Sequence, residues 1–176
     1  MRKIKLSENN KTEYVKMYIK YIEELKAYDS TIESANENIA LSRDKNINSE
    51  VVLFEEENNI IGFAILGTGL PNSFCGHDVF IEEFYVKKEY RRKGYGTEMA
   101  RLIVDSYPSM DFSAFILEYN TIAIEFWEKV FDFLGYSERT SVGNIRAKGN
   151  NTVFKYWALY LPFWYFLDWL LTLFMV

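Results

Sequence analysis

The sequence predicts one domain that mixes helices and strands (α+β), followed by a hydrophobic C-terminal tail. Hydrophobic residues make up 49% and charged residues 26% of the 176 residues, which is typical of a globular protein. Segments with helical and strand periodicity follow one another along the chain. No linker rich in Pro, Gly or Ser divides them, so we expect a single domain over residues 1–157 and a separate tail over residues 158–176.

Composition argues against several classes of protein. Cys75 is the only cysteine and His77 the only histidine, which excludes an internal disulfide, a multi-cysteine zinc site and any site with two imidazoles. We therefore expect no metal, and incidental or structural roles for these two residues. The net charge of −5 argues against a nucleic-acid binder. The chain turns polar directly after Met1, without an apolar signal-like stretch, which favours a cytoplasmic location.

The N-terminal part of the chain predicts a strand, two helices and a pair of strands. Residues 4–6 suit a short strand, and Asn10 with Glu13 predicts a helix N-cap and its capping partner. The apolar face of that helix is given by the residues at helical spacing, which are Val15, Tyr18, Ile19, Ile22 and Leu25. A second, weaker helix is expected to begin at Ser30 and Thr31. Residues 51–54 and 60–66 suit two strands joined by a turn.

The C-terminal part of the domain predicts an alternation of strands and helices. Residues 80–86 and 112–117 suit strands. A helix over residues 97–107 ends before Pro108, and another over residues 121–134 ends at Gly135. Residues 136–142 and 152–157 suit two final strands that pair with each other.

The segment between the strand over residues 80–86 and the following helix has the composition of a phosphate site. Five of the seven residues from Lys87 to Lys93 are cationic, although the protein is acidic overall. Gly94 and Gly96 leave the backbone bare where the helix begins, and the free amides of a helix N-terminus attract anions. The alternative is a solvated basic turn in which the glycines only end one element and start the next.

A second motif favours the phosphate site. The sequence Arg91-Arg92-Lys93-Gly94-Tyr95-Gly96, followed by Asn120-Thr121-Ile122-Ala123-Ile124-Glu125-Phe126-Trp127 and by Gly135-Tyr136, resembles the GNAT superfamily of acetyl-CoA-dependent N-acetyltransferases. The resemblance covers residues 4 to about 157. It implies a mixed, mostly antiparallel sheet flanked by helices and splayed open between its fourth and fifth strands, with acetyl-CoA in the gap.

The resemblance also implies which residues bind the cofactor. The backbone amides of residues 92–97 would hold the pyrophosphate, the basic side chains would add charge, and a backbone N–H near Phe84 or Tyr85 would polarise the thioester carbonyl. Asn120 is expected to contact the cofactor, or to cap its helix, or both. Phe126 is expected in the core and Trp127 beside the sulfur. The complete implied set is Phe84, Tyr85, Val86, Arg91, Arg92, Lys93, Gly94, Tyr95, Gly96, Thr97, Asn120 and Trp127.

Catalysis requires a base for the amine, and an acid for the leaving thiolate helps. Glu82 and Glu83 lie on the strand that borders the expected gap, and strand alternation predicts that they point to opposite faces. Glu83 is our first choice of base, and the alternative is that both are ordinary strand carboxylates. The family often has a tyrosine acid where this chain has Trp127, whose indole cannot release a proton near neutral pH. Tyr119 or Tyr136 would replace that acid, or the thiolate leaves unaided.

The acceptor and the tail are less defined by the sequence. The acceptor is expected to be an amine, and the acidic residues between positions 23 and 37 would attract a cationic one, although a solvated helix surface explains them equally well. Nine of the 21 residues from Tyr156 to Val176 are aromatic. The tail is interpreted as a packing or homodimer segment, and membrane attachment is the less favoured alternative because Pro162 and Asp168 interrupt the apolar run. A non-catalytic acetyl-CoA sensor and a membrane-associated interaction protein are the competing functions.

Overall fold

The computed structural model describes residues 1–45, 48–68, 79–108, 110, 112–117, 119–135 and 144–147. The elements in chain order are β1 (Arg2–Lys5), α1 (Lys11–Leu25), α2 (Glu37–Ser42), the 3₁₀ turn η1 (Arg43–Lys45), β2 (Ser49–Glu56), β3 (Asn59–Thr68), β4 (Val79–Val86), the 3₁₀ turn η2 (Lys88–Tyr90), α4 (Tyr95–Ser106), β5 (Phe112–Phe115), α5 (Thr121–Phe133) and β6 (Asn144–Ala147).

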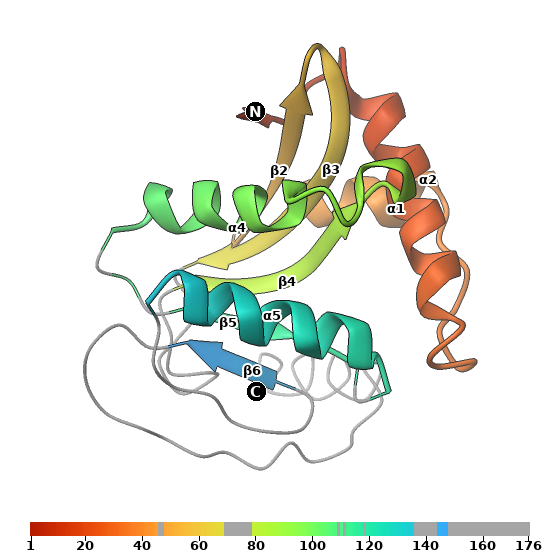
Figure 1. Ribbon diagram of the computed structural model, residues 1–176. Coiled ribbons are helices and arrows are strands. Elements are labelled where there is room, and N and C mark those ends of the chain that lie inside the picture. Colours follow the sequence, from red (N-terminus) through yellow and green to blue (C-terminus); the bar gives the residue numbers. More distant parts are fainter. Residues whose placement is uncertain are drawn as a thin grey trace, which may run out of the picture.

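In these residues the strands form one mixed sheet in the order β1-β2-β3-β4-β5-β6. Neighbouring strands are antiparallel except β4 and β5, which are parallel. The parallel pair requires a crossover, and α4 supplies it between β4 and β5. Figure 1 shows α4 and α5 together in front of the strands, with α1 and α2 on the other side. The predicted fold class, a mixed and mostly antiparallel sheet flanked by helices, is confirmed.

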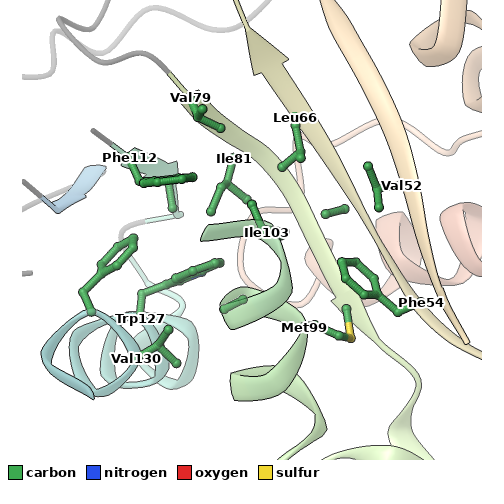
Figure 2. Packing of buried hydrophobic residues seen from close by; sticks show 14 of the residues in the cluster. Val52, Phe54, Leu66, Val79, Ile81, Met99, Ile103, Phe112, Trp127 and Val130 are labelled. Atoms are coloured by element: carbon green, nitrogen blue, oxygen red, sulfur yellow. The ribbon is translucent and has the colours of Figure 1, made fainter. Parts of the chain in front are cut away.

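Two hydrophobic cores lie on the two faces of this sheet. The first lies under α4 and α5, and Figure 2 shows its sheet residues, such as Leu66 and Ile81, facing Met99, Ile103 and Trp127 of the helices. The second lies under α1 and α2 and is rich in aromatic rings: Tyr14, Tyr18, Phe63 and Tyr85. Full burial of one large apolar side chain contributes about 1.5–3 kcal/mol, so these cores hold the helices against the strands.

A bulge in β4 changes which face its side chains take. Along β4, Val79 and Ile81 face the first core, as alternation requires. Opposite them on β3, Leu66 pairs with Ile81 and Ile65 pairs with Glu83, so Glu82 is one residue too many on β4. After the bulge the even-numbered Phe84 and Val86 pack against the first core, and Tyr85 against the second.

The helices on the first face start and end close to where the sequence predicts. The backbone of Gly94, at φ 85°, turns the chain into α4, and Met99 and Ile103 of that helix are fully buried. The side chain of Asn120 accepts a hydrogen bond of 3.1 Å from the backbone N–H of Ala123 at the start of α5. Gly135, at φ 80°, follows the end of α5, which is the conformation expected of a residue after a helix.

On the other face, Asn10 is the N-cap of α1 as predicted but without the predicted side-chain capping contacts, and the second helix starts later than predicted. Asn10 does precede α1, but its side chain bonds backwards, accepting from Ser7 N–H at 2.7 Å and donating to Lys5 O at 3.0 Å. Glu13 pairs with Lys87, the residue that follows β4, instead of completing a capping box. The second helix does not begin at residues 30–31. The backbone N–H and the hydroxyl of Thr31 both donate to the Asp29 side chain, which holds this segment in a turn.

The second helix starts later, where Asn36 caps it. The Asn36 side chain accepts a 3.0 Å hydrogen bond from Ile39 N–H, and α2 begins at Glu37. In the C-terminal part, β6 at residues 144–147 falls between the two strands that we predicted over 136–142 and 152–157. Those two segments lie outside the described residues, as do Cys75, His77, Tyr136 and the tail over 158–176. Within the part of the chain that is described, no helix combines the length and apolarity needed to cross a bilayer.

Candidate active site

The strands β4 and β5 stay together over only part of their length. Val79, Phe80 and Ile81 pair with Phe112, Ser113 and Ala114. β4 then continues to Val86, whereas β5 ends at Phe115. Beyond Ile81, the edge of β4 that faces away from β3 therefore has no strand partner among the described residues. This divergence agrees with the expected splay between the fourth and fifth strands (Figure 1).

The ladder with β3 determines which backbone groups lie on that free edge. Lys87 N–H donates to Ile61 O at 2.9 Å, so the groups of Lys87 point toward β3. In an antiparallel ladder this direction alternates, so Tyr85 also points toward β3 while Phe84 and Val86 point away from it. The Val86 carbonyl accepts a hydrogen bond from Arg91 Nε at 2.7 Å. Of the two amides named from the sequence, Phe84 is therefore the one on the free edge.

The turn after β4 leaves a set of backbone amides without helical partners. Arg92 and Gly94 both adopt positive φ, at 61° and 85°. The first hydrogen bond along α4 runs from Glu98 N–H to Gly94 O at 3.1 Å, so the amides of residues 95–97 have no acceptor within the helix. A Cβ atom on Gly94 would meet nothing within 4 Å. Open space beside bare amides at a helix N-terminus is an arrangement that suits phosphate.

The cations of this turn play different parts. The Arg91 guanidinium is engaged within the protein: it donates to Val86 O at 2.7 Å, pairs with Glu24 of α1 at 2.8 Å, and lies over the Tyr85 ring at 5.2 Å. Lys93 Nζ donates to Glu89 O at 2.8 Å. The side chain of Arg92 is exposed. Arg91 therefore braces the turn against α1, and the exposed Arg92 is the cation best placed to meet a diffusing anion.

The aromatic residues of α5 adjoin this turn. A Cβ atom on Gly96 would lie 3.0 Å from the Phe126 ring, so this glycine accommodates a core contact, unlike Gly94. Phe126 is partly buried and stacks on Phe84 with ring centroids 5.7 Å apart. Trp127 is 4% exposed and meets the same Phe84 ring at 4.9 Å. Trp127 lies in the first core, and the more exposed Phe126 is the α5 ring next to the turn.

The two candidate carboxylates lie on one face of the sheet, which corrects the prediction that they diverge. Arg43 of η1 contacts Glu82 at 2.9 Å and Glu83 at 3.6 Å. Ser49 Oγ donates to Glu82 at 2.9 Å, and the Tyr21 hydroxyl donates to Glu83. The bulge at Glu82 is the physical reason, because one extra residue cancels the alternation between neighbours.

Burial governs the titration of this cluster. Burial raises the pKa of Glu83, while the hydrogen bond from Tyr21 and the charge of Arg43 act against that rise and Glu82 adds to it. Burial, together with Glu83, raises the pKa of Tyr21 well above its ordinary value and that of Tyr18 to about 12. These tyrosines therefore stay neutral, and burial moves the pKa of the Glu83 carboxyl in the direction expected of a general base.

The acidic residues of α1 and the following segment are largely engaged by neighbours. Glu23 pairs with Lys26 at 2.9 Å, and Asp29 holds Thr31. Glu24 binds Arg91 and accepts from the Tyr85 hydroxyl at 3.3 Å. These contacts favour a structural reading of this acidity over a role in attracting a cationic acceptor.

Sequence reasoning missed Arg43, Tyr21 and Ser49. Tyr21 lies on α1 three residues after Tyr18 of the predicted apolar face. A hydroxyl on that face could have indicated a hydrogen bond to a polar group of the sheet. Arg43 and Ser49 reach β4 from segments 39 and 33 residues away in sequence, and no local pattern predicts such contacts. Among the described residues, no group of three or more His, Cys, Asp or Glu side chains is arranged to hold a metal ion.

The comparison with protein families decides the assignment. A family model described as Acetyltransferase (GNAT) family matches residues 14–133, which include the buried residues of both cores, the turn and all of α5. The chain belongs to the GNAT family. Acetyl transfer is therefore its general class of activity, and acyltransferase its general class of enzyme. No curated protein matches the chain.

Solved structures share the GNAT fold with this chain. PH1933 from Pyrococcus horikoshii OT3 has a TM-score of 0.61 and 19% identity, covering 85% of this chain and 99% of its own. A mutant of the BH1408 protein from Bacillus halodurans has a TM-score of 0.62 and 17% identity, covering 81% and 96%. The paiA N-acetyltransferase from Thermoplasma acidophilum, solved with coenzyme A, has a TM-score of 0.55 and 17% identity, covering 82% and 95%. Identities this low show the fold alone.

The structure thus brings the predicted residues together in two groups. Those implied for the cofactor lie at the end of β4, in the turn, at the starts of α4 and α5, and, for Trp127, in the middle of α5. Glu82 and Glu83 lie on the α1 side of β4 with Arg43 and Tyr21. The free edge of β4, with the backbone groups of Phe84, runs between these groups. Tyr119 is 69% exposed, and Tyr136 lies outside the described residues.

Proposed function

We propose that this GNAT protein transfers the acetyl group of acetyl-CoA to a primary amine of a small molecule or peptide, by direct attack in a ternary complex. The observation that carries the proposal is the free edge of β4, which joins the bare amides of the turn to the carboxylates beside Arg43. The turn at one end of this edge suits a phosphate group, and the carboxylates at the other end suit proton transfer from an amine. Acetyl-CoA, whose thioester is carried on an arm with a pyrophosphate, would place its phosphates at the first end and its acetyl group near the second.

The residues of the turn and the strand edge would hold acetyl-CoA, which supplies the acetyl thioester. The amides of residues 95–97 bind the pyrophosphate, with Arg92 and Lys93 adding positive charge and Gly94 leaving room. The backbone of Phe84 and Val86 pairs with the pantetheine arm. The Phe84 N–H polarises the carbonyl, because a fixed donor stabilises negative charge that develops on that oxygen only in the transition state. Asn120 and the rings beside Phe84 border the arm.

Glu83 takes the role of general base in this proposal. The amine nitrogen attacks the carbonyl carbon, the C–S bond breaks, and the proton lost by nitrogen passes to Glu83, directly or through water. The thiolate sulfur accepts a proton from Tyr119, from Tyr136 or from solvent. The products are the N-acetylated amine and coenzyme A. Glu82 is the less suited carboxylate, because both of its oxygens already have partners in Ser49 and Arg43.

Two measurements test the proposal. Acetyl-CoA at saturation should raise the melting temperature, because a ligand that binds only the native state stabilises it by mass action. Thiol release should then be followed with a panel of primary amines: an alkylamine, a polyamine and a short peptide with a free N-terminal alanine. Acetylated product with equal thiol release supports the proposal. Binding without any turnover would identify a sensor instead, and the absence of a melting shift would remove both functions.

A further inference from the structure

Arg43 is a partly buried cation that contacts both candidate carboxylates from outside the GNAT motifs. It belongs to η1, between α2 and β2, and its side chain keeps 22% of its surface exposed. One guanidinium nitrogen lies 2.9 Å from Glu82 and 3.6 Å from Glu83. The bulge in β4 is what allows one arginine to meet two consecutive residues of a strand.

We propose that Arg43 is a positioning residue that keeps Glu83 ionised and oriented for proton transfer, with Glu82 as the counter-charge that holds Arg43 in place. This inference rests on the proposed function, in which Glu83 is the base. It adds a second requirement to that function, namely a residue from η1 that acts only through Glu83 and has no contact with the reacting atoms.

The pattern of contacts distinguishes the two carboxylates. Glu82 has one oxygen bonded to Ser49 and the other to Arg43, both at 2.9 Å. Glu83 has one oxygen bonded to Tyr21, and the other at the longer distance of 3.6 Å from Arg43. The first carboxylate is therefore anchored, whereas the second keeps an oxygen that feels the positive charge without a short hydrogen bond. Such an oxygen is available to accept a proton.

The charges that face Glu83 make Arg43 decisive. Tyr14, Tyr18 and Tyr21 face it from α1, Arg43 and Asp44 belong to η1, and Glu82 and Tyr85 lie beside it on β4. Burial raises the pKa of all four tyrosines, so they stay neutral. Among the described residues, Arg43 is thus the cation that offsets burial and the charge of Glu82. Without it, two neighbouring carboxylates would repel each other and one would take up a proton.

Fold stability alone does not account for this arrangement. Partly buried ion pairs contribute little to stability once desolvation is counted, and Arg43 Nε has no hydrogen-bond partner within the described residues. Burial alone would lower the pKa of Arg43, but Glu83, Tyr18 and Glu82 outweigh it, so the arginine stays charged. A permanent cation with one unsatisfied donor is better explained by its effect on Glu83.

The direct test is a ¹³C NMR titration of the Glu83 carboxyl in the full-length protein, which requires no acceptor. Arg43→Met should raise the pKa of Glu83 by about 1 to 3, the usual effect of losing a nearby opposite charge, and Arg43→Lys should reverse most of that rise. Glu82→Gln removes the neighbouring negative charge and should lower the pKa of Glu83. Opposite shifts in these variants support the inference. An unchanged Glu83 pKa in Arg43→Met overturns it. If Arg43→Met does not fold, Arg43→Gln, which removes the charge but keeps a hydrogen-bond donor, decides the question by the same measurement.

The kinetic test uses whichever amine of the panel the wild type acetylates. The acid limb of kcat/KM should move to higher pH in Arg43→Met and return with Arg43→Lys, while the affinity for coenzyme A stays the same. Arg101→Met, which removes ion pairs with Glu98 and Asp105 on α4, is the matched control and should leave the limb in place. An acid limb that stays in place in Arg43→Met also contradicts the inference. Absence of acetylation in the wild type would instead reject the proposed function, and the titration would still decide the role of Arg43.

Discussion

The ring of Phe126 lies so close to Gly96 that a Cβ atom there would stand 3.0 Å from the ring's Cε2. Gly94, two residues earlier, has nothing within 4 Å of the same hypothetical atom. The two glycines of the motif therefore serve different purposes. Gly96 allows α4 to approach α5, whereas Gly94 supplies a positive φ and an open space in front of the amides.

Gly96→Ala should destabilise the protein. In an open helix, replacing glycine with alanine stabilises by up to about 1 kcal/mol. Here the new methyl meets the Phe126 ring, which Phe84 and Trp127 hold in place, and overpacking of this kind costs about 1–3 kcal/mol. Urea unfolding of Gly96→Ala, Phe126→Leu and the double variant measures the coupling. The double variant should be more stable than the sum of the single effects predicts, and strict additivity would show that the contact is unstrained.

Gly94→Glu should abolish binding of coenzyme A without unfolding the protein. The substitution places a negative side chain in the open space, and a residue at φ 85° costs about 1–2 kcal/mol in backbone strain. Gly135→Glu is the matched control, because Gly135 has φ 80° and equally open surroundings but lies after α5. Both variants should lose similar stability, and only Gly94→Glu should lose affinity, by at least about ten-fold. Equal affinities, measured by calorimetry, would show that the turn does not bind phosphate.

Arg91 and Arg92 should separate stability from binding. Arg91→Gln removes the guanidinium that bonds to the Val86 carbonyl and pairs with Glu24, although Tyr85 still donates to Glu24, and this loss should cost about 1–3 kcal/mol of stability. Arg92→Gln should leave the unfolding free energy unchanged and weaken binding of coenzyme A by roughly two- to five-fold, less so at high salt. Chemical denaturation and calorimetry of both variants check this. The reverse pattern would mean that Arg91 leaves Glu24 to contact the phosphates.

Local patterns predicted the turn and its surroundings because their determinants are local. The glycines, the Asn120 cap and the ends of α4 and α5 depend on backbone preferences within a few residues. The same reasoning failed at Asn36, where a cap was assigned too early because Ser30 and Thr31 also cap helices. Nor does any local pattern predict that Glu24, on a distant helix, pairs with Arg91, whose role at the cofactor stays a prediction.

The carboxylate cluster could not be predicted because it depends on register. Nothing in the β4 sequence marks Glu82 as an extra residue, since the bulge is defined only by the pairing with β3. Without the bulge, Glu82 and Glu83 would face opposite cores, and Arg43 could reach only one of them. A shift of one residue changes the face of every later side chain, so long-range pairing decides this part of the site.

Glu83 should make the free energy of unfolding decrease as the pH rises. Burial raises the pKa of Glu83 in the folded state above its ordinary value of about 4.3, so between these two values the folded state binds more protons than the unfolded state. Stability relative to Glu83→Gln should therefore decrease as pH rises through that interval and then level off. Glu98 gives the opposite sign, because its hydrogen bonds from Arg101 lower its pKa. Wild-type stability relative to Glu98→Gln should decrease as pH falls, and urea unfolding across the pH range measures both differences.

Glu83→Gln should lower the rate of acetyl transfer by roughly 10²–10⁴-fold, the usual contribution of a positioned base. Glutamine keeps the shape of the side chain and can still accept from Tyr21, but it cannot take up the amine proton. Because the pKa of Glu83 is raised, the wild-type rate should fall as pH drops through that value, and this limb should be absent from the variant. Raising the pH should partly rescue Glu83→Gln, since more of the amine is then already neutral.

The affinity for coenzyme A separates this loss of catalysis from a loss of binding. The carboxyl of Glu83 lies on the α1 face of β4 and the amides of residues 95–97 lie at the turn, so Glu83→Gln should bind coenzyme A as the wild type does. Glu82→Gln keeps Ser49 and Arg43 as neighbours and should slow the reaction less than Glu83→Gln. If Glu83→Gln retains full activity at every pH, the amine loses its proton to solvent or another group. Catalysis would then depend on positioning and on the Phe84 amide alone.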